Sequence, residues 1–266
     1  MAVSITVLGS GSKGNSTVIS SSNTRILVDA GFSCRETFRR MSVAGLQAGS
    51  LDAIVITHEH NDHVNGVFML ARKLQIPVFM TGGTHHEWWR SARDKYDGQG
   101  LERVETFSAG RSFQIGDVDV MPFTIPHDAA DPVGFRFTAE GVKVGIVTDL
   151  GYMPENVKYY AQGCDCLMIE SNHDLEMLRS GPYPWSVKQR VLSKKGHLSN
   201  EALAEFFSGD YDGAAAYVVL AHLSEQNNLP EIAKDAAEKA LGGRLNLVQN
   251  RIVLALQNEP IESICF

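Results

Sequence analysis

Three histidines and one aspartate occupy four of the six positions that follow an apolar run. The run spans residues 53–57, and the four side chains are His58, His60, Asp62 and His63. Successive side chains of an extended chain point to opposite sides, so His58 and His60 are expected on the same side. A helix predicted to follow turns Asp62 and His63 toward a neighbouring point. A solvated loop does not explain this spacing, and the cluster therefore predicts a metal site.

The ligand types narrow the choice of metal. Imidazole and carboxylate ligands suit zinc or manganese, with iron and nickel as alternatives. The cluster has no thiolate, which argues against a structural zinc site. Two divalent ions need more than four side chains, and three further candidates lie just past predicted strands: His127, Asp149 and His222. Each alone reads as a surface residue, but their joint placement at strand ends favours one shared site.

The rest of the chain alternates short β-rich runs with helical periodicity. Strands are predicted at 5–8, 17–20, 25–28, 53–57, 77–80, 118–123, 133–138, 142–148, 167–169, 217–221 and 247–256. Helices are predicted at 33–41, 64–74, 87–95, 154–161, 174–179, 184–193, 200–207 and 230–241. No low-complexity linker divides the sequence, so we predict one α/β domain over residues 1–266. The pattern suits two mixed sheets that face each other with helices outside.

Composition excludes some classes of protein. The formal charge is −7, which disfavours extended phosphate contacts but allows a local basic groove. No apolar run approaches the ~20 residues that span a bilayer. The start of the chain has no basic stretch followed by an apolar one, which predicts a cytoplasmic protein. The four cysteines form no Cys-x-x-Cys pair, so reduced thiols are expected.

The T-H-x-H-x-D-H cluster, together with His127, Asp149 and His222, resembles the metallo-β-lactamase superfamily. This resemblance implies an αββα sandwich that binds two metal ions. It implies a first ion held by His58, His60 and His127, a second held by Asp62, His63 and His222, and Asp149 as the bridge. Asp29 matches a family aspartate that usually supports the ligands without being one.

Five further segments indicate one group within this superfamily. They are 9–15, 126–128, 170–174, 196–200 and 222–228, and together they are similar to the YycJ/WalJ group. That group is related to ribonuclease Z and to small phosphodiesterases. The resemblance implies a phosphodiesterase or nuclease, with an exonuclease acting on DNA as one form. A hydroxide that bridges the two ions would attack the phosphodiester, and Asp62 would hold that hydroxide.

A leaving alkoxide needs a proton, and His197 is the candidate general acid. By resemblance to ribonuclease Z, Glu170 would orient it. The alternative is that His197 is only a residue near a helix start. His173 is either a support for the site or structural.

Several other signals are weak. The loop at 9–15 lacks phosphate-loop spacing and reads as a turn whose backbone could line the cleft. His85 and His86 read as surface packing more than as ligands. Lys194 and Lys195 either contact phosphate or are solvated, and Asn227 and Asn228 either hydrogen-bond substrate or form an ordinary turn. No inserted cap domain is visible between Asp149 and His222, and no obvious protruding arm for tRNA is visible, which argues against the processing of structured RNA.

Two other functions remain open. One is a thioester or lactone hydrolase similar to glyoxalase II, because the same metal ligands serve acyl transfer. The other is a regulatory protein that keeps its metals for structure only. A proton donor beside the metals favours phosphodiesters, because an alkoxide gains more from protonation than a thiolate does.

Overall fold

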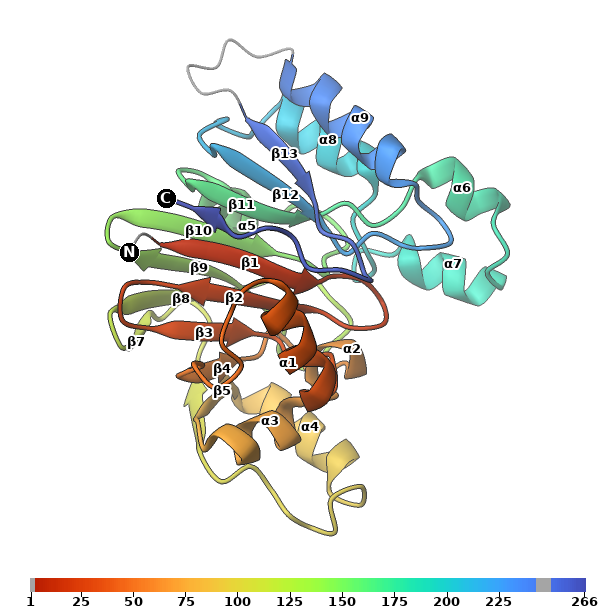
Figure 1. Ribbon diagram of the computed structural model, residues 1–266. Helices are drawn as coiled ribbons and strands as arrows, with labels where there is room; N and C mark the ends of the chain where they lie inside the picture. Colours follow the sequence, from red (N-terminus) through yellow and green to blue (C-terminus); the bar gives the residue numbers. More distant parts are fainter. Residues whose placement is uncertain (1–2, 243–249) are drawn as a thin grey trace.

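Two β-sheets face each other in the computed structural model, which describes residues 3–242 and 250–266 (Figure 1). The first sheet is formed by β1 (Ser4–Gly9), β2 (Ser16–Ser20), β3 (Arg25–Val28), β4 (Ala53–Val55), β5 (Val78–Thr81), β6 (Val104–Phe107) and β14 (Ile264–Cys265). Its order is β14-β1-β2-β3-β4-β5-β6. The pairs β3/β4, β4/β5 and β5/β6 are parallel, and the other pairs are antiparallel.

The second sheet is built in the same mixed way. It is formed by β7 (Phe113–Ile115), β8 (Val118–Thr124), β9 (Val133–Ala139), β10 (Val142–Val147), β11 (Cys166–Glu170), β12 (Tyr217–Ala221) and β13 (Arg251–Leu254). Its order is β13-β12-β11-β10-β9-β8-β7. Strands β10 to β13 run parallel, and β8 runs in the same direction as β10 because both are antiparallel to β9.

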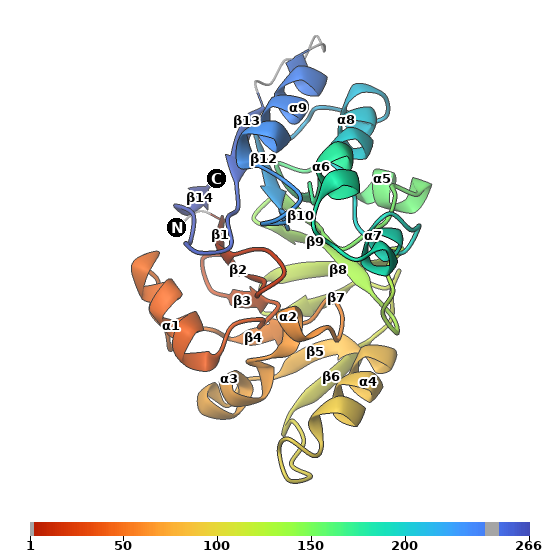
Figure 2. The same ribbon diagram turned by 90° about the vertical axis from the view of Figure 1, so that its right-hand side faces the viewer.

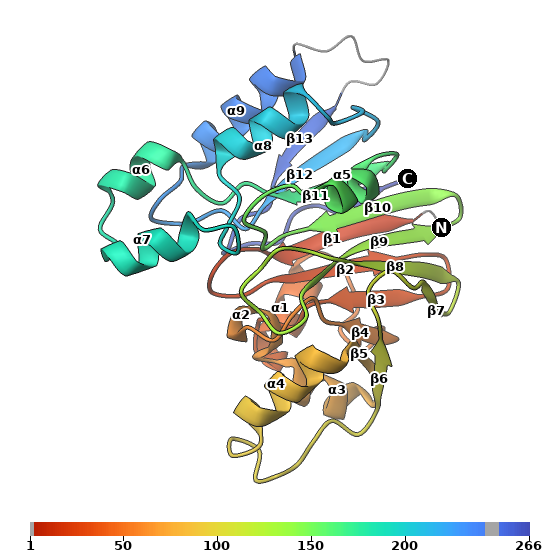
Figure 3. The ribbon, with the colours of Figure 1, turned by 180° about the vertical axis from the view of Figure 1, so that it is seen from behind.

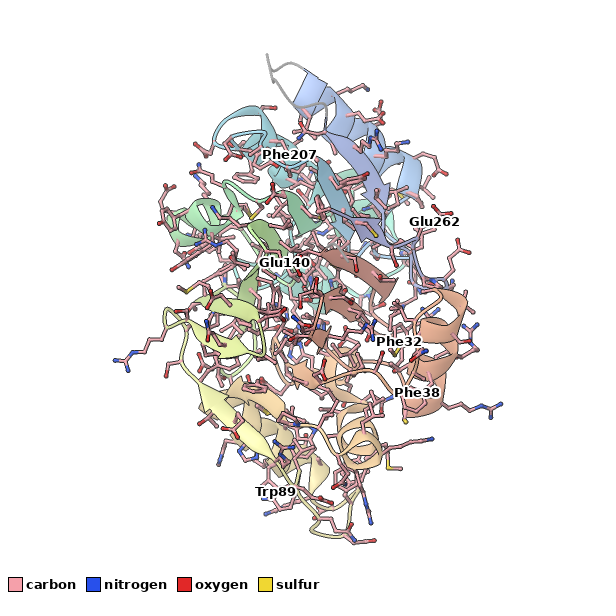
Figure 4. All side chains as sticks on the ribbon, turned by 60° about the vertical axis from the view of Figure 1, so that its left-hand side comes forward. Phe32, Phe38, Trp89, Glu140, Phe207 and Glu262 are labelled. Carbon is pink, nitrogen blue, oxygen red and sulfur yellow. The ribbon has the colours of Figure 1, made fainter. Side chains whose placement is uncertain are left out.

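Helices cover the outer face of each sheet (Figures 2 and 3). Apolar side chains of α1 (Cys34–Val43), α3 (Val67–Leu74) and α4 (Gly82–Ala92) pack on the first sheet. Those of α5 (Glu155–Ala161), α8 (Asn200–Ser208) and α9 (Pro230–Gly242) pack on the second. Phe207 of α8 and Trp89 of α4 accordingly lie toward opposite ends of the molecule (Figure 4). The predicted αββα sandwich is confirmed.

The innermost layer of the core lies between the sheets. Alternate residues of both sheets meet there, among them Ile5 and Val7 of β1 and Val120, Phe135 and Val219 of the second sheet, all buried. Since both sheets contribute to this one cluster, neither half can bury its inner face alone. We therefore propose that the described sandwich is one domain.

Most of the predicted elements are present, and the differences have local causes. The helix predicted at 64–74 is split into α2 (Asn61–Val64) and α3, with Gly66 between them. Glycine at this point lets the chain pass against the backbone oxygen of Phe32, where a Cβ would overlap. The helix predicted at 87–95 begins earlier, at Gly82, because Thr81 caps it through the Thr84 amide. Strands β6, β7 and β14 were not predicted; they are short edge or near-edge strands. Of the strand predicted at 247–256, residues 247–249 lie outside the described part.

Two short helices stand apart from the sandwich. Helices α6 (Leu175–Ser180) and α7 (Trp185–Val191) project from the sandwich between β11 and α8 (Figure 1). Each has at most seven residues, so periodicity alone indicated two helices without indicating that they stand apart.

None of the described helices is both long and apolar enough to cross a membrane. All four cysteines are free thiols.

Gly31 links the first sheet to the metal-site loop. The Asp62 carbonyl accepts from the Asn15 amide at 2.7 Å, and the Asn15 carbonyl accepts from the Gly31 amide at 3.0 Å. A Cβ on Gly31 would overlap the Asp62 carbonyl oxygen and lie 2.5 Å from the Asn15 nitrogen. Only glycine allows these three backbone segments to pack this closely.

We predict that Gly31→Ala lowers the free energy of unfolding by about 1–3 kcal/mol, the usual cost of overpacking a tight contact. Urea denaturation followed by circular dichroism measures the change. Gly82→Ala is the matched control, because its Cβ would meet nothing within 4 Å. Equal urea midpoints for the two variants would show that the Gly31 contact is not a constraint.

Candidate metal centre

The first candidate site is a convergence of three imidazole nitrogens. His58 Nε2 lies 3.1 Å from His60 Nδ1, which lies 3.2 Å from His127 Nε2. Nitrogens around a tetrahedral zinc ion are about 3.3 Å apart, given Zn–N bonds of 2.0–2.1 Å. Burial and the neighbouring imidazoles of His63, His127 and His60 hold the pKa of His58 well below its usual range. A neutral imidazole keeps a lone pair, which is the form that binds a metal.

The second candidate site joins imidazole with carboxylate. The Oδ2 atom of Asp62 lies 3.5 Å from His63 Nε2 and 3.7 Å from His222 Nε2. The Oδ2 atom of Asp149 lies 3.4 Å from the same His63 nitrogen. Asp149 also forms a possible metal-binding group with His58 and His63. It therefore stands between the two sites, as expected of a bridging ligand.

Two observations test whether these residues fit divalent cations. Asp149 Oδ2 and His222 Nε2 are fully buried, and neither has a hydrogen-bond partner among the described residues. Buried polar atoms are normally paired, because each unpaired one costs about 1–3 kcal/mol. The carboxylates of Asp29, Asp62, Asp149 and Glu170 also gather here, and all but Asp62 are buried. The donor set therefore fits cations well, in both charge and ligand type.

Charges within the cluster shift the titration of its histidines. Burial lowers the pKa of His63, but the carboxylates of Asp29, Asp149 and Asp62 outweigh it and hold that pKa well above its usual value. For His222, burial also lowers the pKa, and Asp149, Asp62 and Glu170 raise it further than burial lowers it. The second site is thus strongly anionic, whereas the first is composed of imidazoles. A cation in the second site would take the place of these protons.

Asp29 orients His63 directly and His58 through Thr57. Its Oδ2 accepts from His63 Nδ1 at 2.8 Å, so His63 Nε2 is left facing the site. The Thr57 hydroxyl donates to Asp29 and lies 3.0 Å from His58 Nδ1, so that nitrogen donates to Thr57 and leaves Nε2 free. His127 Nδ1 likewise lies 3.3 Å from the Gly196 carbonyl oxygen, to which it donates, and this leaves His127 Nε2 free. Hydrogen bonds of this kind fix the tautomer of a metal-binding histidine.

Glu170 connects His197 to His222. Its Oε1 accepts from His197 Nδ1 at 2.9 Å and from His222 Nδ1 at 2.8 Å. Its Oε2 accepts from the backbone amides of Leu150 and Leu198 at 2.9 and 3.1 Å. Burial would raise the pKa of Glu170, but the two imidazoles hold it below its usual value. These four hydrogen bonds occupy the carboxylate, so Glu170 is better placed to orient the histidines than to bind a metal.

Strand ends deliver the side chains to one edge of the sandwich. Asp29 follows β3, Asp149 follows β10 and His222 follows β12, and each has a positive φ, of 60°, 62° and 56°. Such angles are uncommon outside glycine and cluster at functional sites. In each case the left-handed backbone directs the side chain of that same residue toward the cluster. The predicted ligands therefore meet because the carboxyl ends of their strands share one edge.

His197 lies just before a helix. Helix α8 begins at Asn200 with Ser199 as its cap, so His197 precedes both. Its amide donates to the Val191 carbonyl at 3.0 Å, and its side chain is 19% exposed. His197 is thus held in a partly open position beside the cluster. Its ring centroid lies 5.3 Å from that of His127.

Some residues singled out in the sequence lie outside the cluster. His85 stacks near Trp88, and neither His85 nor His86 joins a possible metal-binding group among the described residues. His173 is buried, and burial lowers its pKa to about 4. The backbone of His173 pairs with Ser199, which gives it a structural place behind the His197 loop.

Asn15 is a site residue that the sequence analysis missed. Its Nδ2 lies 3.0 Å from His63 Nε2 and donates to Asp62 Oδ2 at 3.3 Å. Its Oδ1 accepts from Ser10 Oγ and the Gly11 amide, which fixes the amide group. Ser10 Oγ in turn accepts from the His222 amide at 2.9 Å. The polar residues of the 9–15 loop were the signal, but a turn explains them equally well in sequence.

Comparisons with known proteins agree with this architecture. A family model described as the Beta-lactamase superfamily domain matches residues 24–223. The exodeoxyribonuclease YycJ of Bacillus anthracis is 36% identical over 241 residues, which cover 91% of this chain and 90% of that protein. The exodeoxyribonuclease WalJ of Streptococcus pneumoniae serotype 2 is 38% identical over 228 residues, which cover 85% and 84%.

A solved structure supports the fold independently. The metallo-β-lactamase fold protein YhfI of Bacillus subtilis superposes with a TM-score of 0.71 over 98% of this chain and 99% of its own. The two sequences are 15% identical. At that identity the match shows the fold alone.

We predict that Asp29→Asn weakens metal binding by roughly 10- to 100-fold, the usual effect of losing a carboxylate that orients a metal-binding histidine. Competition with a chromogenic zinc chelator at constant pH measures the affinity. Asp117→Asn is the control, since Asp117 accepts comparable hydrogen bonds from Ser21 and Asn23. An unchanged affinity in Asp29→Asn would mean that Asp29 does not orient His63 for a metal.

Proposed function

Because the chain belongs to the β-lactamase superfamily, in the group that includes YycJ and WalJ, we propose that it is a phosphodiesterase that removes nucleotides from DNA ends with the help of two divalent cations. The observation that carries this proposal is the cluster of seven converging side chains with a histidine–glutamate pair beside it. The superfamily and the fold make the protein a metal-dependent hydrolase. The number of ions, their identity and the DNA substrate are our proposals.

Two groups of side chains would hold the cations, zinc or manganese. His58, His60 and His127 would hold one, Asp62, His63 and His222 the other, and Asp149 would contact both. When bound, such cations supply a water-derived nucleophile at neutral pH and positive charge that stabilises the phosphodiester oxygens. Asp62 is 24% exposed at its side chain, the most open of these carboxylates, and so it can also hold the attacking water by a hydrogen bond.

His197 would donate the proton that the leaving alkoxide needs. Its Nδ1 is engaged by Glu170, so the ring orientation is fixed and Nε2 is the nitrogen that remains for the substrate. Asp149 Oδ1 lies 3.7 Å from Nδ1, which keeps the acid close to the metal cluster. The buried carboxylate of Glu170 compensates positive charge on the imidazole. His197 and Glu170 therefore act as one unit.

DNA is the proposed substrate because of the relatives. Both curated relatives named above carry the name exodeoxyribonuclease, and this chain aligns with most of their length. An exonuclease needs an open site at which a strand can end, and the partly exposed His197 and Asp62 meet that need.

We predict that His197→Ala lowers phosphodiester turnover by roughly 10²- to 10⁴-fold, the usual contribution of general acid catalysis. It should retain both metals, because His197 is not among the proposed ligands. Turnover of 5′-phosphorylated DNA and elemental analysis of the same samples test both parts. His86→Ala, an exposed histidine on α4, is the control. Full turnover in His197→Ala would remove His197 from the mechanism.

A substrate panel separates the proposal from acyl hydrolysis. We expect the manganese- or zinc-loaded protein to hydrolyse bis(p-nitrophenyl) phosphate and 5′-phosphorylated DNA, and to hydrolyse a thioester far more slowly. The reason is that the His197–Glu170 pair protonates an alkoxide, whereas a thiolate leaves without that help. Thioester turnover without phosphodiester turnover would contradict the proposal, and no turnover of either would favour a regulatory metalloprotein.

A further inference from the structure

The α6–α7 hairpin, defined as residues 175–196, projects beside the metal centre. Figures 1 and 3 show α6 and α7 on the same side of the sandwich as α2, the short helix that carries Asp62 and His63. The hairpin connects β11, which ends at Glu170, to the loop that carries His197. Both ends of the hairpin therefore adjoin the proposed catalytic pair.

The hairpin is basic in an acidic protein. It contains five lysines and arginines and one glutamate, a formal charge of +4 in a chain whose charge is −7. Arg179, Lys194 and Lys195 are exposed, and none of them forms an ion pair with another described residue. A positive segment beside the candidate metal centre attracts a polyanion to that centre.

The same hairpin exposes large apolar side chains. Trp185 is 65% exposed, and Val187 and Leu192 are 37% and 41% exposed. An exposed tryptophan offers a flat ring on which a nucleic-acid base can stack, whatever the base. The combination of free positive charge and an exposed aromatic ring is typical of surfaces that bind single strands.

Short contacts hold the hairpin against the metal centre. The Asp128 amide donates to the Lys195 carbonyl at 3.1 Å, and the Gly196 carbonyl accepts from His127 Nδ1. Arg190 of α7 binds both carboxylate oxygens of Asp128 through Nε and Nη2. With α7 rising 1.5 Å per residue, Trp185 stands on the order of 10 Å from the end of the helix near the site. A strand that ends at the metals can therefore extend along α7.

We propose that the α6–α7 hairpin binds the single-stranded end of a DNA substrate, with Trp185 stacking on a base and Lys194 and Lys195 contacting phosphates. This inference deepens the proposed function and rests on it for the identity of the substrate. The positive charge favours a nucleic acid over an apolar protein partner. Stacking needs an exposed base face, which a single strand offers and the interior of a duplex does not.

Fluorescence anisotropy tests the stacking contact. The metal-loaded full chain is titrated with a labelled, 5′-phosphorylated oligonucleotide whose phosphorothioate linkages slow cleavage. Trp185→Ala should bind roughly tenfold more weakly, within the range for removal of one stacking ring. Tyr159→Ala is the matched control, because Tyr159 of α5 is 64% exposed. Equal affinities for Trp185→Ala and Tyr159→Ala would overturn the proposal.

The salt dependence of binding tests the lysines. Replacing Lys194 and Lys195 together with alanine should reduce the slope of log affinity against log salt by about 0.7 for each single-strand phosphate that a lysine no longer neutralises. The double variant of Lys234 and Lys239 removes the same charge from α9 and should leave the slope unchanged. Equal slopes in the two double variants would also contradict the proposal.

Turnover separates this inference from the proposed function. The ratio of kcat/KM for the oligonucleotide to kcat/KM for bis(p-nitrophenyl) phosphate should fall in Trp185→Ala and stay constant in Tyr159→Ala. If the wild type binds the strand through Trp185 but cleaves no phosphodiester, only the proposed function fails. If Trp185→Ala instead changes the oligomeric state seen by light scattering and leaves strand binding intact, the hairpin is an interface between copies and the inference fails.

Discussion

Negative charge collected at one edge of the sandwich is the constraint on which the rest of this structure depends. Four carboxylates surround His58, His63 and their neighbours, and three of the four are buried. Burial of such charge is unfavourable unless positive charge compensates it. Divalent cations supply that compensation with the ligand types present, and they would also pair the buried atoms that lack hydrogen bonds. A cation bound there would therefore stabilise the site as well as supply its chemistry.

The fold supplies the means of assembling this charge. Parallel strands in each sheet place their carboxyl ends at one edge, and left-handed residues at three strand ends turn side chains into the cluster. The apolar layer between the sheets holds those ends in place, so the strain is carried by a rigid core. A second layer of hydrogen bonds from Asp29, Thr57 and Glu170 then fixes which nitrogen of each histidine faces inward. The site thus depends on rigid strands, on strained turns at their ends and on the hydrogen bonds that orient the imidazole rings.

The sequence predicted the features that depend on local pattern. The seven candidate ligands were predicted because they follow apolar strands and belong to the residue types that metals prefer, and Glu170 and His197 were proposed through resemblance. The sequence could not reveal Asn15, because its amide reaches Asp62 and His63 only after three backbone segments pack around Gly31. Nor could it reveal that two short helices project beside the site, since periodicity reports the face of a helix but not its distance from the core. Short edge strands were missed for the related reason that few of their residues are buried.

The central claim is that seven side chains form a cage for two cations. Diffraction from crystals grown with excess manganese or zinc, recorded on both sides of the metal absorption edge, tests it most directly. We expect two anomalous peaks roughly 3.5–4 Å apart, one beside His58, His60 and His127 and the other beside Asp62, His63 and His222, with Asp149 reaching both. A single peak, or peaks bound by other residues while these side chains stay apart from them, would contradict the account.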